Sequence, residues 1–379
     1  MRSNSGKPLG IYVHIPFCKS KCEYCDFYSL GGSRDRRTTD QYLQALADHI
    51  RETGRLAPDY TVDTVYFGGG TPSFFGAENL EKILDELQKR FHFGADPEIT
   101  LEANPDSVTP QGLKRLVRAG FNRISIGVQS DQDDMLKRLG RPHTYEQARM
   151  AVVRAREAGF ANLSLDLMFG LPNQTLTGWR DTLENVLRLK PEHMSCYALK
   201  VEPNTPLWEY RDCANLPNDD VQADMYLAAS EILQDHGYEH YEISNFCRSD
   251  MYSRHNTSYW KGIPYLGCGP SAHSFNVASL EKYIHAIENN QRLFEQEHLD
   301  RTTCYNECIM TSIRTRWGVP LNDIEQKFGK ELWQYCFDMA RPHLDCGNLE
   351  IYDNNRLCLS RKGIFVSDGI ISDLMFVES

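Results

Sequence analysis

Residues 12–27 read Tyr12-Val-His-Ile-Pro-Phe-Cys18-Lys-Ser-Lys-Cys22-Glu-Tyr-Cys25-Asp-Phe27. The three cysteines are spaced C-x3-C-x2-C and directly follow a β-rich run over Gly10–His14. Thiolates are the ligands of iron–sulfur clusters, and a four-iron cluster usually takes four of them. Because this motif supplies three, we expect Cys18, Cys22 and Cys25 to hold a [4Fe-4S] cluster that keeps one iron open.

The open iron of such a cluster accepts an exogenous ligand. The amino and carboxylate groups of S-adenosylmethionine can chelate it, and an electron passed into the sulfonium then breaks a carbon–sulfur bond to give an adenosyl radical. A zinc site with a distant fourth ligand, or chance clustering of cysteines, are the alternatives. The spacing, the preceding strand and the polar residues at later strand ends favour the cluster.

Composition and charge narrow the class of protein. The chain has 379 residues, 41% of them hydrophobic and 25% charged, which is typical of a globular protein with two domains. Its formal net charge of -11 disfavours a phosphate backbone, so we expect no nucleic acid partner. We see no signal peptide and no apolar run long enough for a transmembrane segment, so we expect a cytoplasmic protein. The nine cysteines outside the motif are expected to be small buried hydrophobes.

Short β-rich runs alternate with amphipathic segments over the first two hundred residues. This alternation predicts an α/β fold with a parallel sheet and right-handed crossovers. Periodicity alone leaves an open sheet and an incomplete barrel as alternatives. The expected strands are Gly10–His14, Thr64–Phe67, Glu98–Glu102, Arg123–Gly127, Asn162–Met168 and His193–Leu199. The expected helices are Thr39–Arg51, Ala77–Phe91, Thr109–Ala119, Thr144–Ala158 and Thr177–Leu189.

The alternation of expected strands and helices ends after Leu199. We expect a loop, then a helix over Asp219–His236, then an irregular aromatic stretch, and we place a domain boundary near residue 285. The two expected domains are therefore residues 1–285 and 286–379. The second should be mainly helical with a short hairpin, its elements being Pro320–Phe328, Lys330–Cys346, Leu349–Tyr352 and Leu357–Leu359.

Polar and glycine residues stand where the expected strands end. The carboxyl ends of parallel strands form ligand sites, so these residues should meet at one edge of the sheet. Tight βα turns, helix caps and solvated loops are the structural alternatives. Asp166, an acid inside an apolar strand, must be paired or functional. The runs are Phe67-Gly68-Gly69-Gly70-Thr71-Pro72, Leu101-Glu102-Ala-Asn-Pro105, Ser125-Ile-Gly-Val-Gln129, Leu139-Gly-Arg141-Pro-His143 and Leu165-Asp166-Leu-Met-Phe-Gly-Leu-Pro172.

Together, the cysteine motif and these runs resemble the radical S-adenosylmethionine (radical SAM) superfamily, and within it the branch that contains the oxygen-independent coproporphyrinogen III oxidases and the HemW heme chaperone family. The resemblance covers nearly the whole chain and implies a partial (β/α)6 barrel followed by a small HemN-type C-terminal domain. One departure is Asp131, where an aromatic residue is usual, and we expect a local packing change there. The resemblance implies an S-adenosylmethionine site lined by Tyr12, Tyr24, Gly69, Gly70, Thr71, Glu102, Gln129, Arg141 and Asp166.

Two features separate the chaperones from the oxidases within this branch. The oxidases resemble C-x3-C-x2-C-x-C, whereas Phe27 stands at the fourth cysteine position here. The oxidases also carry a longer N-terminal extension that helps build a second ligand site, and the seventeen residues before Cys18 are too few for it. The run His255-Asn256-Thr-Ser-Tyr259-Trp260 resembles a HemW motif associated with heme. Imidazole is a common axial ligand of heme iron, so we expect His255 to bind heme. Further candidates for heme contacts are Cys247, Cys268 and His273.

The resemblance therefore implies a heme chaperone that carries a [4Fe-4S] cluster and S-adenosylmethionine and delivers heme to heme-dependent respiratory proteins. It also allows an electron donor, a transient contact with membrane proteins, and a homodimer as further partners. The enzyme alternative is radical decarboxylation of coproporphyrinogen III. The second alternative is a radical SAM methyltransferase that acts on a porphyrin or a nucleic acid.

Overall fold

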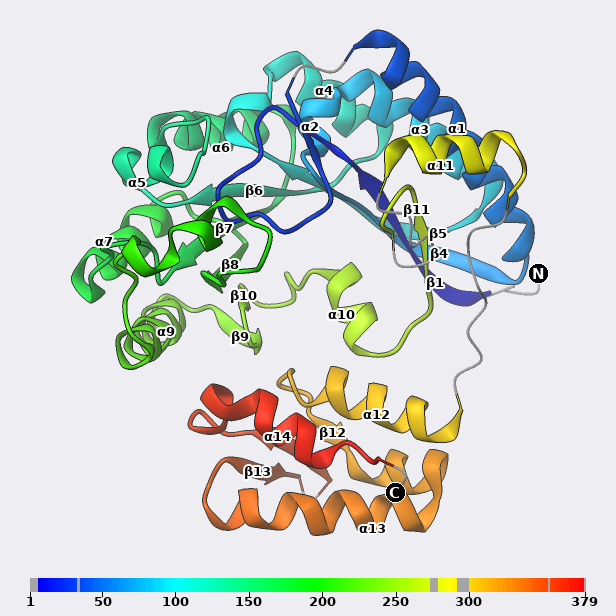
Figure 1. Ribbon diagram of the computed structural model, residues 1–379. Coiled ribbons are helices and arrows are strands. Elements are labelled where there is room, and N and C mark those ends of the chain that lie inside the picture. The colour runs from blue at the N-terminus through cyan, green and yellow to red at the C-terminus, as the bar shows by residue number, and fades with distance from the viewer. Residues whose placement is uncertain (1–5, 33–34, 273–278, 292–299, 354, 378–379) are drawn as a thin grey trace.

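A curved, mainly parallel sheet organises the N-terminal part of the computed structural model, which describes residues 6–32, 35–272, 279–291, 300–353 and 355–377 (Figure 1). The six expected strands are confirmed, and each pairs in parallel with the next along the chain. They are β1 (Lys7–Ile15), β4 (Tyr60–Gly69), β5 (His92–Ala103), β6 (Arg123–Gln129), β7 (Asn162–Phe169) and β8 (His193–Ala198).

The sheet extends beyond these six strands at both edges, which the sequence did not predict. Strand β11 pairs in parallel with β1, while β10 and β9 continue the other edge antiparallel to β8. These strands have only three or four residues, too few to give a period of two in the sequence. The stretch expected to be irregular therefore supplies β9 (Glu239–Glu242), β10 (Asn245–Cys247) and β11 (Tyr265–Cys268).

Helices cover the convex face of the sheet, and the five expected ones are confirmed (Figure 1). Their ends follow local chemistry: the Thr109 hydroxyl caps α4 by accepting a hydrogen bond from the Gly112 amide at 3.1 Å. Gly120 ends the same helix in the left-handed conformation, with φ 115°. The helices of this part are α1 (Arg36–Leu56), α2 (Pro72–Phe75), α3 (Ala77–Arg90), α4 (Pro110–Ala119), α5 (Asp133–Arg138), α6 (Tyr145–Ala158), α7 (Leu176–Leu187), α8 (Pro206–Glu209), α9 (Asp219–Asp235), α10 (Arg254–Trp260) and α11 (Leu280–Glu288).

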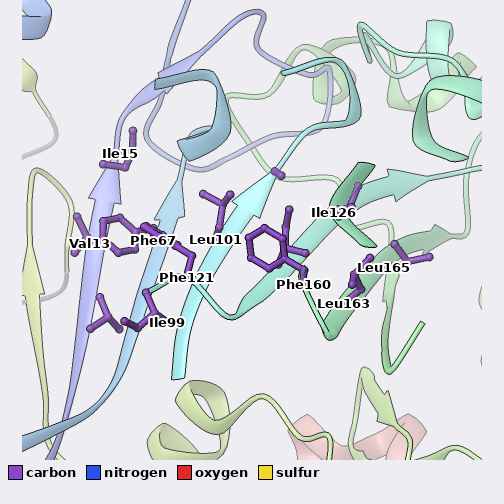
Figure 2. Close-up of a cluster of buried hydrophobic side chains, with 14 of the residues drawn as sticks. Val13, Ile15, Phe67, Ile99, Leu101, Phe121, Ile126, Phe160, Leu163 and Leu165 are labelled. Atoms are coloured by element: carbon purple, nitrogen blue, oxygen red, sulfur yellow. The ribbon is translucent and has the colours of Figure 1, made fainter. Parts of the chain in front are cut away.

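The two faces of the sheet differ in polarity. Figure 2 shows apolar side chains such as Val13, Phe67, Leu101 and Leu165, which are buried in the main core. Alternate positions on the same strands are polar and face the concave side. Since neighbouring residues of a strand point to opposite faces, one alternating pattern builds both the core and a polar interior.

The C-terminal unit has its own core and resembles the expected helix-plus-hairpin arrangement. The long segment α13 is interrupted at Gly329, whose φ of 77° and ψ of 169° are not helical, so the two expected helices on either side of it are confirmed. A short third strand, β12, pairs with β14 of the expected hairpin. The elements are α12 (Arg301–Ser312), β12 (Val319–Pro320), α13 (Leu321–Asp345), β13 (Leu349–Tyr352), β14 (Arg356–Leu359) and α14 (Ser367–Leu374).

The C-terminal unit contacts the edge strand β9 and the loop after β10 through the segment after α12. The Arg316 amide donates to the Tyr241 carbonyl at 2.9 Å, and Trp317 packs against Tyr241 and Tyr252. Residue 285 lies within α11, and a boundary there stays a prediction. None of the helices in the described ranges combines the length and apolar character needed to cross a membrane.

Candidate cofactor site

A cavity of about 560 Å³ opens at the carboxyl ends of the parallel strands. It is lined by every residue that we expected to hold the cluster or S-adenosylmethionine except Tyr12. Residues more than a hundred positions apart, such as Cys22 and Asp166, therefore line one cavity. The lining residues from the sequence prediction are Cys18, Cys22, Tyr24, Cys25, Gly69, Gly70, Thr71, Glu102, Gln129, Arg141 and Asp166.

The cysteine loop is anchored at several points around this cavity. Its start and end form the short parallel pair β2 (Phe17–Cys18) and β3 (Leu30–Gly31). The Cys18 thiol lies 3.4 Å from the Thr71 hydroxyl, and Arg141 donates from Nη1 to the Cys22 sulfur at 3.5 Å. The cysteine loop is therefore held against the turn after β4 and against the segment that carries Arg141.

The donor set fits an iron–sulfur cluster. Cys18, Cys22 and Cys25 are the thiols in the lining. Burial raises the pKa of the Cys18 and Cys25 thiols, so metal binding must displace their protons. In the described part of the chain, no three His, Cys, Asp or Glu side chains converge as they would around a single metal ion. Each thiolate of a four-iron cluster can bind a different iron, so three thiols on one loop suit a cluster.

Two buried polar atoms in the cavity wall lack partners. Gln129 Oε1 and Arg141 Nε form no hydrogen bond with any described residue. Gln129 also has a φ of 66°, a left-handed conformation that costs a non-glycine residue about 1–3 kcal/mol. Arg141 is held in place by Nη2, which donates to Asn104 Oδ1 and to the Gly127 carbonyl, both at 2.8 Å. A strained residue and unsatisfied polar atoms in one wall are typical of a site that binds a polar ligand.

The turn after β4 needs its glycines. A Cβ atom on Gly70 would lie 2.8 Å from the Phe17 carbonyl oxygen, and Gly69 has a φ of 108°. The Gly70 amide donates to the Ile15 carbonyl at 2.8 Å, which fixes the turn against the start of the cysteine loop. A side chain at Gly70 would push the turn away from the cluster position.

Two buried carboxyl groups lie deeper in the cavity. Tyr66 donates from its hydroxyl to Glu102 Oε1 at 2.7 Å, and burial raises the pKa of Glu102 to about 7. Asp166 accepts a hydrogen bond from the Ser125 hydroxyl, which lies 3.0 Å from both carboxylate oxygens, and burial raises its pKa as well. The acid inside the apolar strand is therefore paired and also faces the cavity.

Glu102 makes the stability of the cofactor-free protein depend on pH. Its pKa is higher in the folded chain than the ordinary 4.5, so the folded state binds the proton more tightly and loses stability as the pH rises from about 4.5 to about 7. We expect Glu102→Gln to be more stable than the wild type at pH 8 by up to about 3 kcal/mol, and the gain to shrink towards pH 5. Urea unfolding at both pH values measures this.

A matched control for that experiment is Glu157→Gln, which removes one charge from an exposed position on α6. If Glu102→Gln gains no more stability at pH 8 than at pH 5, the raised pKa of Glu102 is refuted.

Two lining residues, Tyr66 and Arg123, were missed by the sequence analysis, and two others, Asn104 and Ser125, stood in the quoted runs without being expected to bind S-adenosylmethionine. Arg123 and Ser125 alternate along β6 with the buried Ile124 and Ile126. A polar residue at every second position of a strand that packs helices on its other face is a signal for the concave side, and it was available in the sequence.

Tyr12 and His255 do not line the cavity. Tyr12 packs against Tyr66 with ring centroids 6.2 Å apart, and its hydroxyl lies 3.2 Å from His14 Nδ1. His255, on α10, stacks on the same Tyr66 at 5.2 Å. His255 Nδ1 lies 2.9 Å from the Thr64 hydroxyl. Tyr66 therefore contacts both the cavity and His255.

The other candidates for heme contacts are placed as follows. Cys247 on β10 and Cys268 on β11 are fully buried, and burial raises the pKa of both thiols to about 12. His273 lies outside the described residues.

A three-cysteine loop at the mouth of a curved parallel sheet defines a radical SAM protein. The Radical SAM superfamily model matches residues 12–186, and the HemN C-terminal domain model matches residues 299–366. The solved structure of coproporphyrinogen III oxidase (HemN) from Escherichia coli has the same fold, with a TM-score of 0.85 and 24% identity over 99% of this chain and 91% of that one.

Longer sequence matches identify the family. The heme chaperone HemW of Escherichia coli K12 is 40% identical over 346 residues, which cover 89% of each chain. HemW of Bacillus subtilis 168 is 36% identical over 334 residues, covering 85% of this chain and 87% of the relative. This chain belongs to the HemW heme chaperone family.

Proposed function

We propose that this protein is a heme chaperone: it binds heme, carries a [4Fe-4S] cluster with S-adenosylmethionine, and delivers heme to heme-dependent respiratory proteins in the cytoplasm. The observation that carries the proposal is the position of His255, one stacked tyrosine away from the cofactor cavity. The relatives named heme chaperone support the same function.

The residues of the cavity divide the work of holding the cofactors. Cys18, Cys22 and Cys25 would bind the cluster, which when bound supplies an electron to the sulfonium of S-adenosylmethionine. The unpartnered Gln129 Oε1 and Arg141 Nε would bind the polar groups of S-adenosylmethionine. Burial of this wall excludes water from those hydrogen bonds and strengthens them.

His255 has the chemistry of a heme ligand. Burial lowers its pKa to about 4, so the imidazole is neutral at neutral pH and keeps a lone pair for iron. A proton on Nδ1 donated to Thr64 would orient the ring and leave Nε2 as the ligand, the arrangement usual for histidines that bind metals. Tyr259, the exposed aromatic residue of the same helix, would pack against the porphyrin.

A change at Tyr66 should separate the binding of S-adenosylmethionine from the binding of heme. Tyr66→Phe keeps the ring that stacks on His255 but removes the hydrogen bond to Glu102, so the carboxyl loses its fixed position. We expect the affinity for S-adenosylmethionine to fall about five- to tenfold, since a buried hydrogen bond contributes about 1 kcal/mol, while the heme spectrum stays unchanged. Equilibrium dialysis and a heme titration measure the two effects.

The control is Tyr259→Phe, which removes a hydroxyl from the heme-facing helix and should leave the affinity for S-adenosylmethionine unchanged. An unaltered affinity in Tyr66→Phe would exclude Glu102 from the binding of S-adenosylmethionine.

The second candidate function is radical decarboxylation of coproporphyrinogen III, which the shared fold with the HemN oxidase favours. Phe27 opposes it: this residue stands at the expected fourth cysteine position, and its side chain is 71% exposed at the rim of the cavity. Anaerobic incubation with coproporphyrinogen III, S-adenosylmethionine and a reductant tests the choice. Formation of protoporphyrinogen IX would overturn the chaperone proposal.

The proposal implies partners besides heme: an electron donor for the cluster, heme-accepting respiratory proteins bound transiently, and a second copy of the chain as a homodimer. Sedimentation of the cluster-loaded and cluster-free chain would test the dimer. A monomer in both states would remove it from the proposal.

A further inference from the structure

A second cavity, of about 440 Å³, lies between the sheet and the C-terminal unit. Its described wall combines residues of α9 and of β9 and its following turn with the segment after α12 and with β14. It shares no lining residue with the cofactor cavity, and its volume is within the range of small-molecule sites.

Four arginines line this interdomain cavity, from three places in the C-terminal unit. Arg314 and Arg316 follow α12, Arg356 begins β14, and Arg361 follows that strand. Guanidinium groups bind carboxylates and phosphates through two parallel hydrogen bonds, so several of them around one cavity favour an oxyanion.

Three of the arginines form ion pairs with carboxylates: Arg316 with Glu239, Arg356 with Asp353 and Arg361 with Glu231. The side chains of these carboxylates are 34%, 76% and 50% exposed, respectively. Exposed ion pairs contribute little, so these arginines can exchange a surface carboxylate for a ligand at small cost.

Arg314 differs from the other three. It forms no ion pair with any described residue, and its Nε atom is buried without a hydrogen-bond partner there. Its guanidinium lies over the Trp260 ring at 5.4 Å, so stacking holds it in place without using its donors. Glu242, a carboxyl in the same wall, accepts hydrogen bonds from the Ser244 amide and the Asn245 side chain; burial raises its pKa, and the nearby Arg314 charge opposes that rise without forming an ion pair. Arg314 is therefore a half-buried cation whose buried Nε donor is free to bind a ligand.

The rest of the wall is mixed, with apolar side chains beside polar ones such as Gln234 and His240. Tyr226, Ile243, Ile313 and Ile364 face the same space as the arginines. From this combination we infer that the interdomain cavity binds a small amphipathic oxyanion, with its carboxylate or phosphate group on Arg314 and its apolar body against these side chains. This site goes beyond the proposed heme and cofactor sites and does not depend on them.

Isothermal titration of the full chain with phenyl phosphate, inorganic phosphate and 3-phenylpropionate tests the site. Phenyl phosphate or 3-phenylpropionate should bind saturably and more tightly than inorganic phosphate, and the tighter of the two identifies the head group. Arg314→Gln should weaken that binding at least tenfold. The control Arg341→Gln, an exposed arginine on α13 paired with Asp338, should leave it unchanged.

Arg361→Gln provides a second test in case Arg314→Gln does not fold. The Arg361 side chain is 56% exposed, so its removal leaves no buried gap. We expect a severalfold loss of affinity in this variant. The inference is overturned if no probe binds saturably, if binding is unchanged in both arginine variants, or if inorganic phosphate binds as tightly as the two phenyl compounds.

Discussion

A variant with Cys18→Ala, Cys22→Ala and Cys25→Ala is expected to lose the iron–sulfur cluster completely. These are the three thiols that line the cofactor cavity, and each would bind a separate iron. After anaerobic reconstitution, the broad visible charge-transfer band of the wild type should be absent from the triple variant, and its iron content should fall to background. S-adenosylmethionine binding should weaken with it, since its chelating groups lose the open iron.

The control for the triple variant is a double replacement of exposed cysteines, Cys213→Ala and Cys346→Ala, which should keep the band and the iron. A triple variant with the wild-type band would show that the cluster is held elsewhere, and the assignment of the cysteine loop would then be wrong.

His255→Ala is expected to change the heme spectrum and weaken heme binding more than tenfold, because the axial imidazole is lost. The cluster band should stay, since His255 does not line the cofactor cavity. A heme titration followed by absorbance in the Soret region measures the heme spectrum and the heme affinity on one sample. His236→Ala, at an exposed histidine that ends α9, is the matched control and should bind heme as the wild type does.

Removal of a half-buried ring can also disturb the fold, so His255→Met provides a second test. A thioether is an alternative axial ligand, and a spectrum that differs from those of both the wild type and His255→Ala would identify position 255 as the ligand. Unaltered spectra in both variants would exclude His255.

Much of the fold was readable from local patterns. Each expected strand carried apolar residues at alternate positions, and Thr109 and Gly120 marked the two ends of α4. Gly329 separated two expected helices, and the structure breaks the helical conformation at that residue. These features depend on contacts between residues close in sequence, which a single sequence displays.

The rest depends on contacts between distant segments. Strands β9, β10 and β11 form because they can pair with strands at the edges of the sheet. They have too few residues to show a two-residue hydrophobic period. The stacking of His255 on Tyr66 joins residues 189 positions apart, and the interdomain cavity forms only where two units meet. No local pattern could predict these.

Asp131 shows how a departure from a family pattern can be explained by packing. The resemblance led us to expect a local change there. The structure places the Asp131 carboxylate at the side of α7, where it accepts hydrogen bonds from the Thr182 hydroxyl at 2.5 Å and the Asn185 side chain at 2.7 Å. Polar anchoring to α7 therefore holds the segment after Gln129, and the cavity wall is kept.

Heme binding by this chain can be measured by an anaerobic titration of the cluster-loaded protein with heme. We expect a saturable change in the Soret absorbance, with one heme bound per chain. If the Soret absorbance equals that of free heme at every addition, with no saturable component, the chain does not bind heme.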